Sequence, residues 1–206
     1  METLQKHSLT EPDFNYSGNY TYADYLRWTI EERIELIRGK IFRMSPAPSS
    51  NHQTILNNIN GPLWSFLKNQ PCQVFVAPFD VRFPRKSKQD NDIVTVLQPD
   101  LCVICDPSKI DARGGIGAPD LIIEILSPGN SKKEMRLKYE VYEESGVKEY
   151  WVVDGERKVC HLFLLEDGQY KACRPFVEGD VLESRVLPGF KIPVDEVFFR
   201  KFGEKE

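Results

Sequence analysis

The chain has 206 residues, of which 41% are hydrophobic and 28% are charged, and its formal net charge is -4 at pH 7. This length suits one sizeable hydrophobic core rather than two, so we predict a flexible N-terminal arm over residues 1–20 and a single domain over residues 21–206. No stretch approaches the roughly 20 apolar residues of a membrane span, and the first residues lack the apolar segment of a secretion signal. We therefore expect a soluble, cytoplasmic protein without a membrane partner.

The negative net charge argues against a protein that coats nucleic acid through a broad basic surface, because such binding neutralises phosphates with Lys and Arg. It does not exclude a nuclease, since carboxylates that hold a cation add negative charge at the site itself. Two local basic clusters could still contact a phosphate backbone, although each is by default a solvated loop or helix end. The clusters are Arg85, Lys86 and Lys88, and Lys132, Lys133 and Arg136.

The five cysteines are odd in number. A chain of this length does not need disulfides to fold, and no secretion signal is evident, so we expect all five thiols to be reduced. Cys102 and Cys105 form a Cys-x-x-Cys motif, but residues three apart point to opposite faces of a strand. Without a second such pair or paired histidines, the motif does not indicate a zinc site.

The predicted elements begin with a short helix over residues 22–29, which Thr21 can cap. Residues 34–44 are predicted to form a β-hairpin that turns at Arg38-Gly39. A long helix follows over residues 51–69, because its apolar side chains recur at helical spacing. These side chains are Ile55, Ile59, Leu63 and Phe66.

Four β-rich runs come next, separated by Pro, Gly and charged residues. They cover residues 73–78, 79–84, 96–106 and 120–128, and we place the third and fourth in the centre of a sheet.

The last third of the chain alternates between helix and strand. A helix over residues 130–145 and a buried strand over 148–154 form a crossover unit with the preceding strand. A hairpin turning at Asp167-Gly168 and a short helix near residues 194–199 follow. This order predicts an α/β or α+β fold with a mixed sheet.

One carboxylate lies inside an otherwise apolar strand. Glu124 shares a strand face with Ile122 and Leu126, where a carboxylate is costly unless it is paired, hydrogen-bonded or bound to a cation. A buried salt bridge and a metal site explain Glu124 alone equally well. Asp100, which follows Pro99 at the start of an apolar strand, is a second candidate.

Lys138 favours the metal hypothesis. In the helix after Glu124, Lys138 lies on the same stripe as Met135 and Tyr142, so it should face the sheet. A structural ion pair would use such a Lys, and so would a nuclease that needs a cation beside the attacking water. We expect Tyr142 and the nearby aromatic residues to belong to the core.

Several segments together resemble the Uma-type branch of the PD-(D/E)XK nucleases. They are Pro99-Asp100, IEILSP at 123–128, KYEVY from Lys138, GVKEYWVVD from Gly146 and, upstream, IELIRGKIFRMSPAPSSNHQ. The similarity covers most of residues 22–195, and the combined pattern is specific, whereas Pro-Asp alone is weak. The resemblance implies a restriction-endonuclease-like fold, with a mixed β-sheet core flanked by helices and with extra β-hairpins.

The chain departs from the parent motif of the superfamily at one position. That motif has a Lys two residues after the Glu, where this chain has Leu126. An intact site therefore needs a displaced Lys, and the resemblance offers Lys138. It also implies that Asp100 and Glu124 bind Mg²⁺ or Mn²⁺, with the carbonyl of Ile125 as a further ligand. Lys138 would position the attacking water or balance negative charge.

Glu35 and His52 become candidates through the same resemblance. Glu35 would face the cleft and bind a second metal or a water, and a strand-edge ion pair with Arg38 or Lys40 is an equally good interpretation. His52 would donate to a phosphate or to Asp100, although a lone His is more often a surface or capping residue.

Ser127 and Glu134 are weaker candidates for the edge of the site. Ser127 most simply ends its strand, and Glu134 precedes Lys138 by one helical turn, as in an ordinary ion pair on a helix.

The implied function is an endonuclease that hydrolyses phosphodiester bonds in DNA with Mg²⁺ or Mn²⁺. Because cutting both strands calls for two sites related by a two-fold axis, we expect a homodimer. The alternatives are a non-catalytic descendant of the fold that acts as a binding or assembly module, and a small-molecule enzyme that uses the same carboxylates.

Overall fold

The computed structural model describes residues 18–29, 32–44, 48–127 and 132–200. Most of the predicted N-terminal arm and the predicted start of the helix after Glu124, at residues 130–131, lie outside these ranges. The division into an arm and a single domain stays a prediction. Within the described ranges, no helix is both long and apolar enough to cross a membrane.

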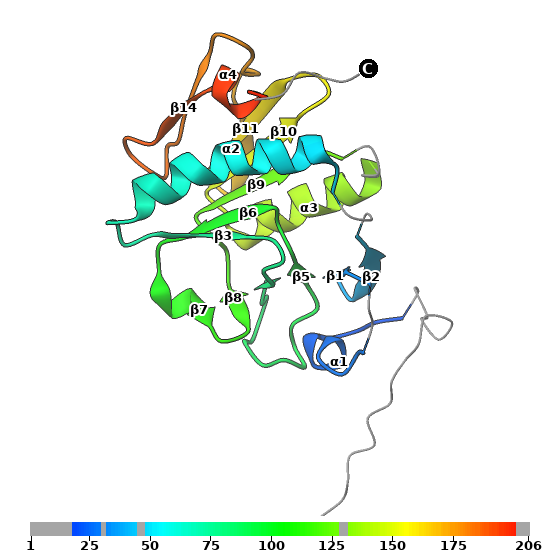
Figure 1. Ribbon diagram of the computed structural model, residues 1–206. Helices are drawn as coiled ribbons and strands as arrows, with labels where there is room; N and C mark the ends of the chain where they lie inside the picture. Colours follow the sequence, from blue (N-terminus) through cyan, green and yellow to red (C-terminus); the bar gives the residue numbers. More distant parts are fainter. Residues whose placement is uncertain (1–17, 30–31, 45–47, 128–131, 201–206) are drawn as a thin grey trace, which may run out of the picture.

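The described residues form helices and strands of a mixed α+β fold (Figure 1). The helices are α1 (Tyr22–Tyr25), α2 (Ser50–Leu67), α3 (Lys132–Ser145) and α4 (Val194–Val197), with a 3-10 helix η2 (Pro107–Lys109). The first sheet has the order β2-β1-β5-β4-β8-β7 and the second β12-β11-β10-β9-β6-β3, while β13 pairs with β14.

The strands of the first sheet are β1 (Ile34–Ile37), β2 (Lys40–Arg43), β4 (Val81–Arg82), β5 (Val96–Leu97), β7 (Ile110–Asp111) and β8 (Gly114–Ile116). Those of the second sheet are β3 (Gln73–Val76), β6 (Leu101–Ile104), β9 (Leu121–Ile125), β10 (Glu149–Asp154), β11 (Val159–Glu166) and β12 (Gln169–Ala172). The remaining pair is β13 (Val181–Glu183) and β14 (Lys191–Pro193).

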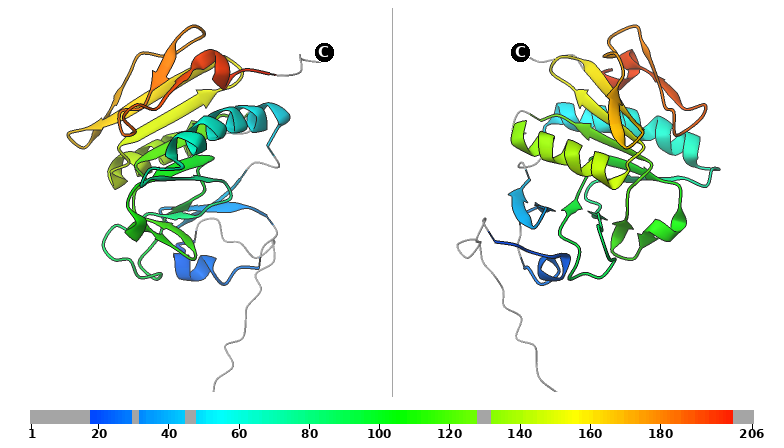
Figure 2. Two further views of the ribbon diagram at one scale, coloured as in Figure 1. Left: turned by 60° about the vertical axis from the view of Figure 1, so that its left-hand side comes forward. Right: turned by 180° about the vertical axis from the view of Figure 1, so that it is seen from behind.

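The second sheet lies between α2 and α3, which cover its opposite faces (Figures 1 and 2). The alternation of side chains along β9 produces this arrangement. Ile123 and Ile125 pack in one core cluster with α2, whereas Ile122 packs with Tyr142 of α3 in another. Glu124 is on the face of Ile122 and is therefore directed towards α3.

The segment β9-α3-β10 is a crossover unit, as the sequence predicts. β10 pairs in parallel with β9, with Val152 opposite Glu124, and both strands are buried inside the second sheet. α3 ends at Ser145, and Gly146 follows it with a positive φ of 87° that suits a helix C-terminus. The crossover places Lys138 and Tyr142 of α3 beside Glu124 of β9.

The two predicted hairpins are present, and their turns explain their register. Arg38 and Gly39 have φ values of 50° and 78° between β1 and β2, and Asp167 and Gly168 have values of 51° and 78° between β11 and β12. Two consecutive positive φ values characterise the tight turn that matches the twist of antiparallel strands. The first hairpin carries Glu35 in the middle of β1.

The predicted beginnings of the first two helices are also confirmed. Thr21 caps α1 and accepts a hydrogen bond from the N–H of Asp24, although this helix ends at Tyr25 rather than at residue 29. Ser49 caps α2 and accepts from the N–H of His52 at 3.2 Å. This cap fixes the first turn of α2, where His52 lies.

The run over residues 96–106 is not one strand but two strands in different sheets. β5 belongs to the first sheet and β6 to the second, and residues 98–100 link them. Pro99 has no N–H to donate to a strand ladder, so pairing is interrupted there. The predicted central place of the run holds for β6, and the link brings Gln98 and Asp100 between the two sheets.

The expectation of five reduced thiols is wrong for two of them, because Cys72 and Cys105 form a disulfide. β3 pairs antiparallel with β6, and Gln73 faces Ile104 across the pair. Cys72 precedes β3 and Cys105 follows β6, so the same register brings their side chains together. Cys102, which points to the other side of β6, is buried and free.

Candidate active site

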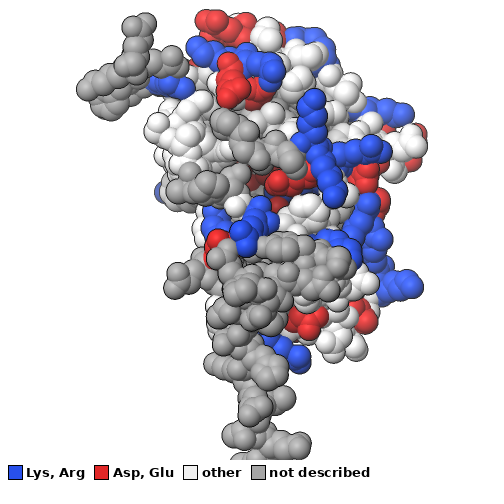
Figure 3. All heavy atoms as spheres, turned by 90° about the vertical axis from the view of Figure 1, so that its right-hand side faces the viewer, with Lys and Arg blue, Asp and Glu red and all other residues white. Residues whose placement is uncertain are grey.

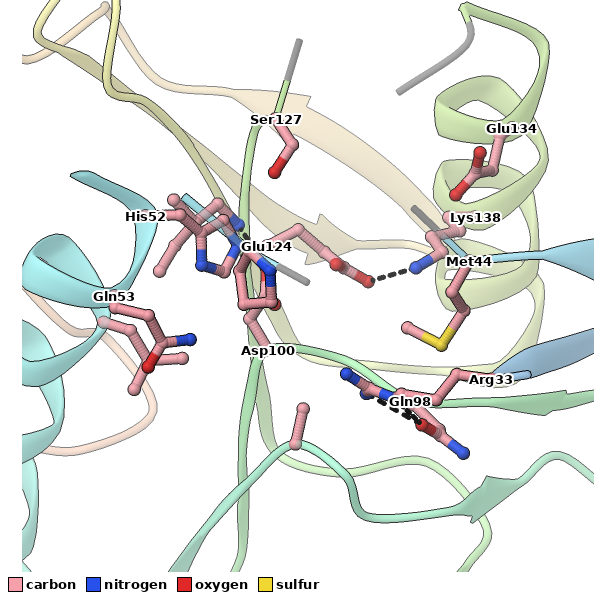
Figure 4. A pocket seen from close by; sticks show the side chains of 14 residues that line it. Arg33, Met44, His52, Gln53, Gln98, Asp100, Glu124, Ser127, Glu134 and Lys138 are labelled. Atoms are coloured by element: carbon pink, nitrogen blue, oxygen red, sulfur yellow. Dashed lines mark hydrogen bonds and ion pairs between the residues drawn. The ribbon is translucent and has the colours of Figure 1, made fainter. Parts of the chain in front are cut away.

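A pocket of about 90 Å³ lies between the two sheets near the N-terminal ends of α2 and α3 (Figure 4). Polar and charged side chains form most of its lining: Arg33, His52, Gln53, Gln98, Asp100, Glu124, Ser127, Glu134 and Lys138. Figure 3 shows the face on which these ends lie, where Lys and Arg side chains surround a small acidic group. The pocket therefore combines carboxylates with a basic rim.

Asp100 is held at the pocket by the link between the sheets. Its Oδ2 accepts a hydrogen bond from the backbone N–H of Ile125 at 2.8 Å and lies 3.2 Å from Nε2 of His52. Within the described residues, no group donates to the other carboxylate oxygen, Oδ1. The Asp100 carboxylate is thus oriented through one oxygen, and the other oxygen is available to a ligand.

Glu124 shows the same asymmetry. Its Oε1 accepts hydrogen bonds from Nζ of Lys138 at 3.1 Å and from the phenol of Tyr142 at 2.6 Å. No donor to Oε2 occurs in the described part of the chain. Lys138 and Tyr142 are one helical turn apart on α3, so one face of this helix orients the carboxylate.

Lys138 is buried between two carboxylates, and Figure 4 shows its contact with one of them, Glu124. Its Nζ lies 2.9 Å from Oε1 of Glu35 as well as 3.1 Å from Oε1 of Glu124. Glu35 itself is only 1% exposed and accepts a hydrogen bond at 2.9 Å from the backbone N–H of Gln98. Glu35 is on the same face of β1 as Ile37, which packs in the core cluster of α3. This face directs Glu35 to Lys138 rather than to Arg38 or Lys40.

The charges around Lys138 do not balance. Two carboxylates, those of Glu35 and Glu124, contact the single ammonium group, and the charge of Asp100 acts on Glu124 from nearby. Burial raises the pKa of Glu124 to about 7; Lys138 opposes this shift, whereas the charges of Asp100 and Glu35 add to it. The neighbouring carboxylates outweigh burial at Lys138 and raise its pKa. The pocket keeps a cationic Lys and an excess of negative charge.

His52 approaches Asp100 from the first turn of α2. Burial lowers the pKa of this imidazole, but the hydrogen bond to Asp100 and the charges of Asp100 and Glu124 outweigh burial, and the pKa is raised. The carbonyl of Ile125 acts in the same direction. The Nδ1 atom is buried, and no described residue bonds it. His52 is therefore placed to hold the Asp100 carboxylate.

The donor set fits a hard divalent cation. Asp100 and Glu124 line one pocket, which Ile125 also lines. Among the residues that the structure describes, no three His, Cys, Asp or Glu side chains form a metal-binding cluster by themselves. The two carboxylates and a backbone carbonyl are nevertheless a sufficient set of ligands for Mg²⁺, because this cation usually takes one or two protein carboxylates and keeps several waters.

The structure brings the sequence-predicted residues together. His52, Asp100, Glu124, Ile125 and Lys138 line the pocket, and Glu35 contacts it through Lys138. The weaker candidates Ser127 and Glu134 line it as well. Of the basic clusters, Arg85 and Arg136 are engaged in ion pairs with Glu144 and Glu140. The roles of the site residues remain predictions.

Four polar residues of the site, Tyr142, Gln53, Arg33 and Gln98, were not identified from the sequence. We predict Tyr142 from the sequence only as a core residue. Its position one turn after Lys138, on the same stripe of the helix, indicates that it could also contact Glu124. Arg33 and Gln98 gave no signal, because their contact joins positions 65 residues apart.

Residues 22–195 match the family model described as "Uma2: Putative restriction endonuclease". The chain belongs to this family. An "Uncharacterized protein slr1290" from Synechocystis is 23% identical over 178 residues, covering 85% of this chain and 89% of the relative. The crystal structure of a "putative nuclease belonging to DUF820" from Anabaena variabilis has a TM-score of 0.68 and 22% identity, covering 87% of this chain and 97% of that chain.

The similarity to the Anabaena variabilis structure confirms the predicted fold class, a restriction-endonuclease-like α+β fold with mixed sheets. Membership of the Uma2 family supports a nuclease function. The residues that gave the resemblance in the sequence, from the hairpin of β1 and β2 to β10, lie within the matched range.

Proposed function

We propose that this Uma2-family protein is an endonuclease that hydrolyses phosphodiester bonds in DNA and depends on Mg²⁺ or Mn²⁺. The observation that carries this proposal is that Asp100 and Glu124 line one pocket and that one oxygen of each carboxylate, Asp100 Oδ1 and Glu124 Oε2, accepts no hydrogen bond from the described residues. A buried Lys lies beside them. The family supports the nuclease activity, and the donor set supports the metal.

Asp100 and Glu124 would hold the cation, with the carbonyl of Ile125 as a further ligand. When bound, the cation would stabilise negative charge on the phosphate and make a nearby water more acidic. The protein contributes prearranged ligands, since Ile125 N–H, Tyr142 and Lys138 fix the two carboxylates before any cation arrives. Little reorganisation is then needed when substrate binds.

Lys138 would act on the water and on the phosphate. Its ammonium group is positioned by Glu35 and Glu124, and its raised pKa keeps it charged at neutral pH. A fixed cation beside the reacting phosphate stabilises the charge that develops there. Glu35 would serve as the anchor of Lys138, and His52 as the anchor of Asp100.

The test is cleavage of supercoiled plasmid DNA with Mg²⁺ or Mn²⁺, with an RNA of matched length as a second substrate. We expect nicking by the wild type and its loss in Asp100→Asn, Glu124→Gln and Lys138→Met. Lys133→Met removes an exposed charge from the same helix and should retain activity. Titration calorimetry with each metal provides a readout independent of cleavage, and only the two carboxylate variants should lose metal binding.

Absence of both cleavage and metal binding in the folded wild type would contradict the proposal. A non-catalytic binding or assembly module of the same fold would then be the better description.

We also propose that the active form is a homodimer, because cutting both strands requires two active sites in a symmetric arrangement. Analytical ultracentrifugation over a range of concentrations tests this. A monomer that converts supercoiled DNA only to nicked circles would exclude the dimer while leaving the nuclease proposal intact.

A further inference from the structure

Arg33 is a cationic side chain of the pocket that has no role in the site described so far. It immediately precedes β1, it is exposed, and it lines the same pocket as Asp100 and Glu124. In Figure 4 its side chain extends beside Gln98, across the pocket from His52 and below Lys138. Arg33 therefore adds a positive charge to the open side of a pocket that has an excess of carboxylates.

The partner of Arg33 is unusual for this protein because it carries no charge. Both Nε and Nη2 of Arg33 donate to the amide oxygen Oε1 of Gln98, at 3.2 and 2.9 Å. Arg82 and Arg157, in contrast, donate to carboxylates. No carboxylate forms an ion pair with Arg33 in the described part of the chain, although its charge acts on the nearby Asp80, so the guanidinium is oriented by a neutral partner.

Gln98 is itself held in one orientation. Its Nε2 donates to Oδ1 of Asp80 at 2.8 Å, and an amide that donates there must turn its oxygen towards Arg33. The backbone N–H of Gln98 also donates to Glu35, the anchor of Lys138. One residue of the link between β5 and β6 thus fixes the position of Arg33 relative to the catalytic Lys.

A guanidinium group in this setting suits a phosphate. Arg has five N–H donors, and the two directed at Gln98 leave three, including those on Nη1, for an anionic ligand. The fork of donors matches phosphate oxygens, with which Arg forms paired, charge-assisted hydrogen bonds. A polyanion that approaches three carboxylates needs such a cation at the entrance of the pocket.

We propose that Arg33 binds a backbone phosphate of the nucleic acid next to the scissile bond, and that Gln98 is a positioning residue that aims the guanidinium without neutralising it. This inference rests on the proposed nuclease function. It assigns substrate binding to Arg33, a residue outside the metal ligands and Lys138.

The experiment compares Arg33→Gln, Gln98→Met and the control Arg185→Gln. Arg185 is exposed and does not line the pocket, so its variant matches the loss of one charge. Two quantities are measured: KM and kcat for cleavage of a short DNA duplex, and the affinity of that duplex without divalent metal at several salt concentrations. Circular dichroism and thermal melting check that each variant is folded.

For Arg33→Gln we expect KM to rise about tenfold or more with a smaller change in kcat, because hydrogen bonds to a charged group are lost. The plot of log affinity against log salt should become shallower by about 0.9, the effect of one phosphate contact. Gln98→Met should raise KM while the salt slope stays that of the wild type, because the charge remains but its position is lost. Arg185→Gln should match the wild type in KM.

The inference is overturned if wild type cleaves DNA but Arg33→Gln has an unchanged KM and salt slope, or if Arg185→Gln changes both as much. That outcome leaves the nuclease proposal standing. If the wild type neither binds nor cleaves DNA, the proposed function fails, and the role of Arg33 fails with it.

Discussion

Lys138, for which we propose a role in catalysis, should also contribute to stability. It is almost fully buried and lies within 3.1 Å of two carboxylates, so removing its charge leaves Glu35 and Glu124 buried without a cation. Breaking a buried pair in this way typically costs about 3–5 kcal/mol. The cost comes from the carboxylates that stay behind rather than from the lost Lys.

We expect Lys138→Met to lower the free energy of unfolding by about this amount at neutral pH, and by less at about pH 5. Without Lys138, which opposes the rise, the pKa of Glu124 is raised further, and a group with a raised pKa is stabilising below its unfolded pKa and loses that contribution as pH rises. Urea unfolding at two pH values measures this. Lys133→Met, with its exposed side chain, is the control, and equal losses in the two variants would refute the prediction.

Metal binding should release a proton in a pH-dependent way. Burial, together with the charges of Asp100 and Glu35, raises the pKa of Glu124 to about 7. At about pH 6 most Glu124 is protonated and must lose this proton to bind a cation, whereas at about pH 8.5 it is already ionised.

Calorimetry of Mn²⁺ binding in two buffers of different ionisation enthalpy counts the protons. We expect nearly one proton at the lower pH and almost none at the higher. His52→Asn should preserve most of this difference, since it removes the other titrating group at the site. A proton count that does not change with pH would contradict the loss of a proton by Glu124 on metal binding.

At the residue scale, sequence reasoning identified the groups that depend on local pattern. Glu124 was detectable because a carboxylate interrupts an apolar strand, and Lys138 because it lies on the sheet-facing stripe of the next helix. The contacts of Glu35 with Lys138, and of Arg33 with Gln98, depend on how two sheets meet. No periodicity in the sequence indicates how the two sheets pack against each other.

The turn between β10 and β11 offers a test at the scale of an element. Lys158 has a φ of 52°, in the left-handed region that is unfavourable for side chains other than Gly and Asn. We expect Lys158→Asn to raise the free energy of unfolding by about 0.5–1 kcal/mol, because Asn tolerates this conformation.

Thermal and urea unfolding measure this effect. Lys171→Asn, at an exposed position in β12, is the matched control and should be neutral or slightly destabilising. A destabilised Lys158→Asn variant would mean that the side chain of Lys158 makes a larger contribution than its backbone conformation costs.

The elements that the sequence predicted well have strong local signals. α2 and α3 follow from helical spacing and the two hairpins from their turn residues. β8 escaped prediction because its sequence is Gly114-Gly115-Ile116, which lacks β-forming side chains. The break between β5 and β6 was not predicted, because the residues on both sides of Pro99 are equally suited to strands.

At the scale of the molecule, the disulfide between Cys72 and Cys105 links β3 to its neighbour β6 and closes a loop with a sequence separation of 33 residues. A loop of this length restricts the unfolded chain enough to contribute about 3–4 kcal/mol. No motif in the sequence indicates this pair, because only the register of β3 against β6 brings the two thiols together.

We expect the oxidised protein to lose several degrees of melting temperature when a reductant is added. The double variant Cys72→Ser/Cys105→Ser should melt at the temperature of the reduced wild type and should not respond to reductant. A wild type whose melting temperature is unaffected by reductant would contradict a stabilising disulfide.

The three-residue link between β5 and β6 should make this part of the chain intolerant of insertions. One extra residue there would reverse the alternation of β6, so that Leu101 and Val103 would exchange faces with Cys102. It would also displace Asp100 from the N–H of Ile125. A scan of single-residue insertions should therefore find none that fold at residues 98–100 and several at the exposed residues 88–89. Members of a lineage that keep this site would be expected to vary in length elsewhere and to keep this link constant.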